Sequence, residues 1–345
     1  MDTEEYRSGC HIADGHCLDP DVVFDVGGGM MDYPTIAAAV QEVSMQAEGT
    51  IMVHVNGGMA YSESLEINEG AVVAIIASDG AHPSVESIGA GERVVDAIGP
   101  DTYVYLEGMR LVGNNERTVA LLTGSILYLD QCEVIAGAGH AAVDVRQVLE
   151  SGDRGGAAGE RSYVTIRNST IWANNNSNED LMAAVEVRGS SANIEYSTIV
   201  NVAGTMATDV NDLGCVPDNG APLVNVRNSI LFNRGEVMVD GGCSEATVSY
   251  SAVTDEEWTV GGNMAKENTH VNESDVMMVP SGDFAELFVS LAPPSQSDLR
   301  LSGAGQALLV NVAQRGPDDL PFDIDGDERP PVGDMDYAGA DLPGP

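Results

Sequence analysis

The stretch Val164-Thr-Ile-Arg-Asn-Ser-Thr-Ile-Trp-Ala-Asn174 decides the fold. It consists of two short segments of alternating apolar residues with Asn168-Ser169 between them, which is typical of two strands joined at a bend. The phrase returns as Val224-Asn-Val-Arg-Asn-Ser-Ile-Leu-Phe-Asn233, and in weaker form as Ala192-Asn-Ile-Glu-Tyr-Ser-Thr-Ile-Val200. A bent two-strand phrase that recurs along a chain is a structural unit, and it predicts a repeat architecture.

Related phrases extend the repeat in both directions and fall into three columns of strands. The central apolar residues of one column are spaced by 23, 37, 28, 32 and 22 residues, and they are Leu106, Leu129, Ile166, Ile194, Val226 and Val248. A second column precedes each of these strands, as at 142–146 and 184–188, and a third follows it, as at 170–172 and 198–200. We interpret the segments at 151–159 and 205–222 as loop inserts that lengthen two of the spacings.

Three ordered columns with inserts confined to the bends predict an all-β, right-handed parallel β-helix in which stacked rungs share one core. A β-sandwich would also have many short strands, but it would not explain loops inserted at the same corners. Apolar residues at helical spacing over 34–43 predict a short helix that caps the open end of the solenoid. We expect a polar leader at 1–20, the β-helix domain at 21–310 and an acidic Pro/Gly/Asp-rich closing tail at 311–345 that packs over the last rungs.

Composition excludes several classes of partner. The 345 residues carry a formal net charge of −39 with Lys266 as the single lysine, so nucleic acid and anionic membrane are excluded as partners. The sequence has no apolar run of about 18 residues that would span a membrane. We expect a monomer. The first residues lack a basic region followed by an apolar one, so we predict no signal peptide within this chain.

The cysteines lack zinc-type spacing and suggest disulfides. Cys10 and Cys17 bracket a short loop, and Cys215 and Cys243 each precede a repeat strand within a Gly/Asp-rich segment. We therefore expect two disulfides among these four residues and a buried Cys132, which favours an extracellular or cell-surface location. The missing signal peptide argues against that location.

Three passages resemble secreted bacterial members of the pectin-lyase-like superfamily of right-handed parallel β-helix proteins. The opening, from Tyr33-Pro-Thr-Ile-Ala-Ala-Ala-Val to Tyr61-Ser-Glu-Ser-Leu-Glu-Ile67, is similar to the start of such proteins. The Asn-Ser-x-Ile rungs match their middle. The phrases Asp323-Ile-Asp-Gly-Asp-Glu-Arg-Pro330 and Gly333-Asp-Met-Asp-Tyr-Ala-Gly-Ala340 are similar to the closing segment of many bacterial surface members. The resemblance implies the β-helix fold, and activity has to be argued from the site.

Motifs of the superfamily's enzymes are absent. The chain lacks the Asp-Phe-Ile-Phe-Gly phrase of the pectin methylesterases, the Gly-His-Gly phrase of the polygalacturonases and the Arg-x-Pro-x-x-Arg phrase of the pectate lyases. We therefore favour a protein that binds carbohydrate or another surface ligand without catalysis. The alternative is a polysaccharide lyase or glycoside hydrolase acting on acidic polysaccharides, and converging carboxylates or an arginine in a groove would distinguish it.

Outward positions of the strands supply the candidate ligand-binding residues. Neighbouring rungs lie roughly 4.8 Å apart, so Asp130, Arg167, Glu195 and Arg227 are predicted to alternate in sign along one face. We favour a surface ion-pair ladder here over a carbohydrate-binding strip. Tyr105 and Tyr128 are expected to be outward and could stack on sugar rings. Asp144, Arg146, Glu186 and Arg188 could perform acid/base work on an acidic sugar, although cross-rung salt bridges are the interpretation that we favour.

The densest carboxylate cluster lies in the tail. Asp323, Asp325 and Asp327 stand at alternate positions, and Asp334 and Asp336 follow a turn. Hard oxygen ligands in such a pattern suit calcium. The spacing is not that of an EF-hand, and acids that hydrogen-bond turn amides explain the cluster equally well.

Overall fold

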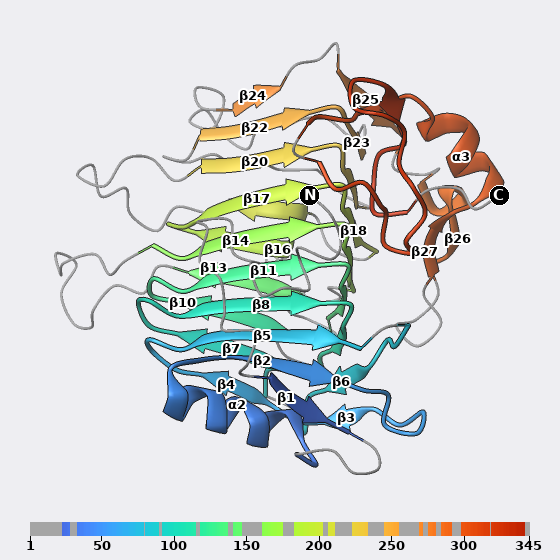
Figure 1. Cartoon of the computed structure of the whole chain (residues 1–345). Helices are drawn as coiled ribbons and strands as arrows, with labels where there is room; N and C mark the ends of the chain where they lie inside the picture. The colour runs from blue at the N-terminus through green and yellow to red at the C-terminus, as the bar shows by residue number, and fades with distance from the viewer. Residues whose placement is uncertain are drawn as a thin grey trace, which may run out of the picture.

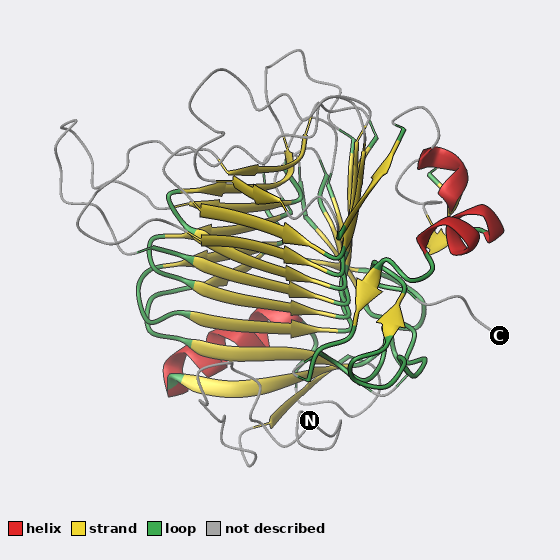
Figure 2. Ribbon diagram, turned by 90° about the horizontal axis from the view of Figure 1, so that it is seen from above, coloured by secondary structure: helices red, strands yellow, loops and turns green. Residues whose placement is uncertain are grey.

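The computed structural model describes residues 23–27, 33–78, 80–89, 92–114, 118–136, 141–146, 161–174, 183–202, 206–210, 223–233, 245–254, 269–271, 275–280, 284–291, 298–317 and 319–341. Within them the chain is a parallel β-helix whose stacked rungs form three sheets, one along each face (Figure 1). Parallel pairing runs from Val23 to Val279, and every strand pair among the three sheets is parallel. Figure 2 shows the stacked strands, with the helix of the C-terminal region to one side of them.

The strands of each sheet follow one another from rung to rung. The ten-stranded sheet contains β1 (Val23–Val26), β2 (Glu48–Val53), β5 (Val72–Ala77), β8 (Tyr103–Glu107), β11 (Ile126–Asp130), β14 (Tyr163–Arg167), β17 (Ser191–Glu195), β20 (Leu223–Arg227), β22 (Glu245–Ser249) and β24 (Thr269–Val271). The six-stranded sheet contains β4 (Leu65–Ile67), β7 (Val95–Ile98), β10 (Val119–Leu122), β13 (Val143–Arg146), β16 (Ala183–Arg188) and β19 (Met206–Val210). The nine-stranded sheet contains β3 (Tyr61–Ser62), β6 (Ser84–Glu86), β9 (Arg110–Val112), β12 (Glu133–Ile135), β15 (Thr170–Ala173), β18 (Thr198–Asn201), β21 (Ile230–Asn233), β23 (Ser251–Thr254) and β25 (Val276–Val279).

The register confirms the first predicted column. Leu106, Leu129, Ile166, Ile194, Val226 and Val248 are successive partners across the ten-stranded sheet, and each is at most 1% exposed. The predicted second column corresponds to the six-stranded sheet, and the predicted third column corresponds to the nine-stranded sheet. One expectation was wrong: β19 is a strand inside the segment 205–222, which we had interpreted as a loop insert. Asp209 of β19 pairs in register with Glu186 of β16, so this part of the segment contributes a rung to the six-stranded sheet.

The Asn-Ser pair of the repeated phrase makes the corner between the ten-stranded and nine-stranded sheets. Asn168 and Asn228 have φ of +44° and +55°, a left-handed conformation that asparagine tolerates better than most residues. The serine that follows stacks on the serine of the next rung, because the Ser197 N–H donates to Ser229 Oγ at 3.2 Å and the Ser169 N–H to Ser197 Oγ at 3.4 Å. Cys132 stands at the start of this ladder, fully buried and unpaired with another cysteine, as predicted.

Helix α2 (Ile36–Gln46) caps the N-terminal end of the stack, where the sequence predicted a helix (Figure 1). Its buried face comprises Ile36, Ala39, Val40 and Val43. The side chain of Thr35 accepts a hydrogen bond from Ala38 N, and the carboxylate of Glu63 accepts from Ile36 N and Ala37 N. A carboxylate at a helix N-terminus satisfies two orphan amides and complements the helix dipole.

The C-terminal region, residues 284–341, packs on the outer face of the nine-stranded sheet and forms a second core there. Within this region η3 (Phe284–Leu287), β26 (Phe288–Ser290), β27 (Asp298–Leu301) and α3 (Gly303–Leu309) come first, and β28 (Ala313–Gln314) and β29 (Met335–Asp336) follow. The segment 297–303, expected as a last rung or a docking strand, is the docking strand, since β27 pairs antiparallel with β26. The second core includes Trp172, Val200, Ile230, Phe232, Phe284, Phe288, Leu301 and Leu309.

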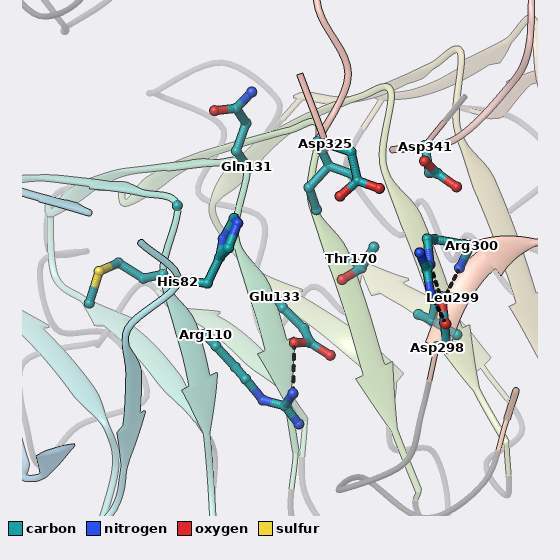
Figure 3. Close-up of a pocket in the computed structure, with 13 residues that line it drawn as sticks. His82, Arg110, Gln131, Glu133, Thr170, Asp298, Leu299, Arg300, Asp325 and Asp341 are labelled. Carbon is teal, nitrogen blue, oxygen red and sulfur yellow. Dashed lines mark hydrogen bonds and ion pairs between the residues drawn. The ribbon is translucent and has the colours of Figure 1, made fainter. Parts of the chain in front are cut away.

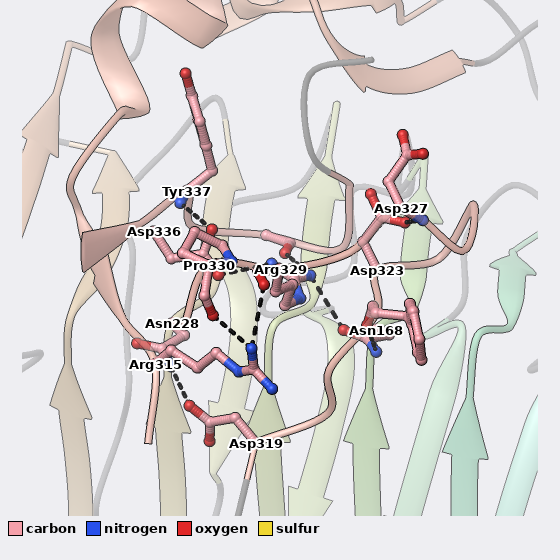
Figure 4. Close-up of polar contacts among 12 residues, drawn as sticks. Asn168, Asn228, Arg315, Asp319, Asp323, Asp327, Arg329, Pro330, Asp336 and Tyr337 are labelled. Carbon is pink, nitrogen blue, oxygen red and sulfur yellow. Dashed lines mark hydrogen bonds and ion pairs between the residues drawn. The ribbon is translucent and has the colours of Figure 1, made fainter. Parts of the chain in front are cut away.

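Arg329 fixes the tail to the corner of the solenoid (Figure 4). Its guanidinium is fully buried, lies 3.2 Å from Asp336 Oδ2 and 3.1 Å from Asn168 Oδ1, and stands 3.9 Å above the ring of Tyr196. Gly339 has φ of +99°, and a Cβ there would come within 2.6 Å of Ile230, so only glycine fits this contact. The tail therefore crosses the corners that follow β14, β17 and β20, where it contacts Asn168, Tyr196 and Asn228, whereas we had expected it over the last rungs.

Candidate cleft between the nine-stranded sheet and the tail

A cleft opens where the C-terminal region stops covering the nine-stranded sheet (Figure 3). Its floor carries Arg110, Glu133 and Thr170, which are register partners on β9, β12 and β15. On later rungs the same column continues as Thr198, Ile230 and Ala252, which are buried. The change from apolar to charged residues within one column thus marks the edge of the second core.

The opposite wall comes from β27 and the tail. It includes Asp298, Leu299 and Arg300 of β27 together with Ile324, Asp325 and Asp341 of the tail, and the cleft has a volume of about 370 Å³. His82, Gly108, Met109 and Gln131 complete the lining. Gln131, at the corner between β11 and β12, also donates from Nε2 to the carbonyl of Asp323 at 2.9 Å, so the solenoid holds the wall in place at this point.

Two ion pairs fix charged groups on opposite sides of the cleft. On the floor, Arg110 Nη1 lies 3.3 Å from Glu133 Oε2. Burial raises the pKa of Glu133, and Asp298 raises it further, while Arg110 and His82 act in the opposite direction. On the wall, Arg300 Nε donates to Asp298 Oδ1 at 2.9 Å, and this hydrogen bonding lowers the pKa of Asp298. These pairs hold hydrogen-bonding groups at fixed positions facing the cleft.

Asp341 is the unusual carboxyl of the wall. Its residue is 6% exposed, and burial followed by the charges of Asp325 and Asp323 raises its pKa to about 7. Arg300 and a hydrogen bond with the backbone of Leu301 act in the opposite direction. Near neutral pH this carboxyl therefore retains its proton in a substantial fraction of molecules, unlike an exposed aspartate.

The lining alternates donors and acceptors. Arginine and glutamine supply N–H donors, and the carboxylates supply acceptors. Two arginines face four carboxyls, Glu133, Asp298, Asp325 and Asp341, so the formal charge of these groups is 2 − 4 = −2, or −1 when Asp341 is protonated. Such a lining repels anions and suits a ligand with many hydroxyl groups.

The predicted tyrosine pair lies elsewhere, on the outer face of the ten-stranded sheet. The ring centroids of Tyr105 and Tyr128 are 6.5 Å apart, but the residues are only 1% and 6% exposed. The Tyr105 hydroxyl donates to Glu107 Oε2 at 2.8 Å, and Arg167 Nη2 lies 2.7 Å from Asp130 Oδ2. The rings are therefore not an open stacking surface, which corrects the expectation of exposed aromatics.

The predicted acid/base group lies on the six-stranded sheet. Arg146 bridges Asp144 at 2.6 Å and Glu186 at 3.3 Å, and both carboxylates are 1% exposed. The structure thus brings three of the four residues together as a cross-rung ion-pair cluster, away from the cleft lining. The side chain of Arg188 lies outside the described residues, as do Cys10, Cys17, Cys215 and Cys243.

The five tail aspartates differ in their surroundings. Asp323 Oδ1 accepts from the amides of Asp325 and Asp327 at 3.0 and 2.8 Å, and Asp336 pairs with Arg329. Asp325, Asp327 and Asp334 are exposed. In the described part of the chain no three His, Cys, Asp or Glu side chains are grouped to hold a metal ion. Asp323 therefore hydrogen-bonds turn amides, which was the alternative to calcium, and the calcium site gains no support.

Comparison with known proteins finds solved structures that are similar to this chain at low sequence identity. No family model and no curated protein matches the chain. Among solved structures, that of pectate lyase Pel9A is similar over 97% of this chain and 99% of its own, with a TM-score of 0.47 and 10% identity. The crystal structure of Escherichia coli ybhc is similar over 79% of this chain and 85% of its own, with a TM-score of 0.32 and 10% identity. The parallel β-helix itself follows from the strand pairing above. None of the described helices is long and apolar enough to cross a membrane.

Proposed function

We propose that the protein binds a neutral polysaccharide in the cleft between the nine-stranded sheet and the tail. The observation that supports this is the lining of the cleft, in which fixed donors and acceptors face each other from the two sides. A sugar hydroxyl both donates and accepts, so each one can contact an arginine and a carboxylate at once. Neutral polysaccharides include those of cell walls, and we propose an extracellular or cell-surface location together with this ligand.

The charge of the cleft sets the class of polysaccharide. A polyuronate would bring a carboxylate on each residue to a lining whose formal charge is already negative, and unlike a neutral glycan it would be repelled. The proposal thus narrows the expected carbohydrate ligand to a neutral glycan and departs from the acidic polysaccharide of the alternative hypothesis.

Calorimetric titration with soluble dextran, mixed-linkage β-glucan, arabinoxylan, galactomannan and polygalacturonate tests the proposal. We expect binding to at least one neutral polymer and none to polygalacturonate. Arg300→Gln, which removes the donors facing the cleft from β27, should weaken binding about tenfold, or about 1.4 kcal/mol. Arg93→Gln is the matched control, because the Arg93–Asp96 pair lies on the six-stranded side. Equal loss in both variants, or binding only to polygalacturonate, would refute the proposal.

A further inference from the structure

We infer that the cleft also cuts the glycan it binds, with Asp341 as the proton donor and Glu133 as the residue that activates water. This inference rests on the proposed binding function. It uses two carboxyls that reach one cleft from separate elements, the tail and β12. Two such groups, one protonated and one ionised, are what hydrolysis of a glycosidic bond requires.

Asp341 has the surroundings of an acid. It is almost completely buried at the wall of the cleft, and the charges that face it are Asp325 and Asp323 from the tail and Arg300 from β27. The two aspartates and burial disfavour a further negative charge, while Arg300 is occupied by Asp298 through two hydrogen bonds. The proton is therefore held on a group that lines the cleft, as general acid catalysis requires.

Glu133 has the surroundings of a base. Arg110 favours its ionised form from the floor, and burial together with Asp298 makes that form more basic than a solvated glutamate. Glu133 and the tail carboxyls stand on different sides of the cleft, with Thr170 beside Glu133 on the next rung (Figure 3). The proposal places the sugar residue in the cleft between these two sides.

The reaction balances with water as the only co-reactant. Asp341 transfers its proton to the glycosidic oxygen as the bond between that oxygen and the anomeric carbon breaks. A water molecule forms the new bond to the anomeric carbon and gives its proton to Glu133. The excess proton on Glu133 and the deficit on Asp341 are then restored by exchange with solvent. An eliminating lyase would need an acidic sugar, which the charge of the cleft disfavours.

Asp341→Asn separates binding from cleavage, because the amide keeps the shape of the carboxyl and cannot release a proton. The probe is whichever neutral polymer of the panel the wild type binds, and reducing ends are measured between pH 4 and pH 9. We expect wild-type cleavage to fall as pH rises through about 7, the pKa of Asp341, and the variant to lose at least 100-fold in rate while binding within threefold. Glu133→Gln should also lose cleavage. Asp101→Asn, which removes one exposed carboxylate from a turn before β8, is the control.

Each outcome decides between the claims. Loss of cleavage in Asp341→Asn with binding retained and the control active supports the inference. Binding of a neutral polymer by the wild type without cleavage at any pH overturns the inference and leaves the proposed function standing. Cleavage that survives in Asp341→Asn overturns the role of this residue. Absence of binding to every neutral polymer overturns the proposed function and the inference with it.

Discussion

Replacing Asp341 by asparagine should stabilise the protein above neutral pH and leave its stability unchanged in acid. In the folded state the pKa of Asp341 is raised from 3.8 to about 7, so the folded protein retains a proton that the unfolded chain releases. The free energy of unfolding therefore falls as pH rises from about 4 to about 7, and it stays lower above that range. Asparagine has no such titration.

The shift sets the size of the effect. A difference of roughly three pKa units corresponds to about 4 kcal/mol between the two protonation states. Because the carboxyl borders an open cleft, solvent screening reduces this value, and we expect a gain of about 2 kcal/mol at pH 8. Below pH 4 the carboxyl is protonated in both states, and the variant should match the wild type.

Urea unfolding at pH 4, 6 and 8, followed by circular dichroism, measures the effect. Asp101→Asn removes the same formal charge from an exposed turn and should show a difference of less than about 0.5 kcal/mol at every pH. An Asp341→Asn variant that is less stable than wild type at pH 8 would refute the reasoning. It would mean that the hydrogen bond from Leu301 and the charge of Arg300 outweigh burial and the neighbouring aspartates.

Three further predictions concern the tail and the corner ladder. Arg329→Met should lower the free energy of unfolding by about 3–5 kcal/mol in urea melts, because it leaves Asp336 buried without its cation. The control Arg93→Met, at a partly exposed ion pair, should lower it by less than about 1 kcal/mol, and equal losses would contradict a stabilising role for the buried Arg329–Asp336 pair. EDTA should leave the melting temperature unchanged, because Asp323 already accepts hydrogen bonds from turn amides and Asp336 already pairs with Arg329. A lower melting temperature in EDTA would support the calcium hypothesis. Cys132 should not react with iodoacetamide in the native protein at pH 8, because the thiol is buried and burial raises its pKa to about 12, and it should react in urea. Peptide mapping measures the labelling, and labelling of the native protein would contradict the burial of Cys132.

The rungs could be predicted from the sequence because each residue of the repeated phrase has a local reason for its place. Ile166 and Val226 recur at the centre of alternating strands, and Asn168 recurs where the corner needs a left-handed residue. The second core was missed, although Ile230-Leu-Phe232 carries its signal. A run without alternation is typical of a strand buried on both faces, which requires something to cover the outer one.

The cleft could not be predicted from the sequence for a different reason. Glu133 and Asp341 are 208 positions apart, and only the path of the tail brings them to one cleft. The sequence of the tail predicted an ordered segment, but the partners of Arg329 on the solenoid lie at the corner, in Asn168 and Tyr196. Neither of these residues had a pattern that pointed to the tail.

The contacts of the tail connect its docking to the composition of the cleft. Arg329 donates to the carbonyls of Gly339 and Ala340, the two residues before Asp341, and Ile324 N donates to Ala340 O. The same buried arginine thus holds the segment that carries Asp341 and lies beside the turn that carries Asp325. A carboxyl whose ionisation opposes folding can remain at the cleft only where other contacts hold its backbone. In this chain Arg329, Ile324 and Thr198 supply those contacts, so the stability of the clamp and the chemistry of the cleft depend on one docked tail.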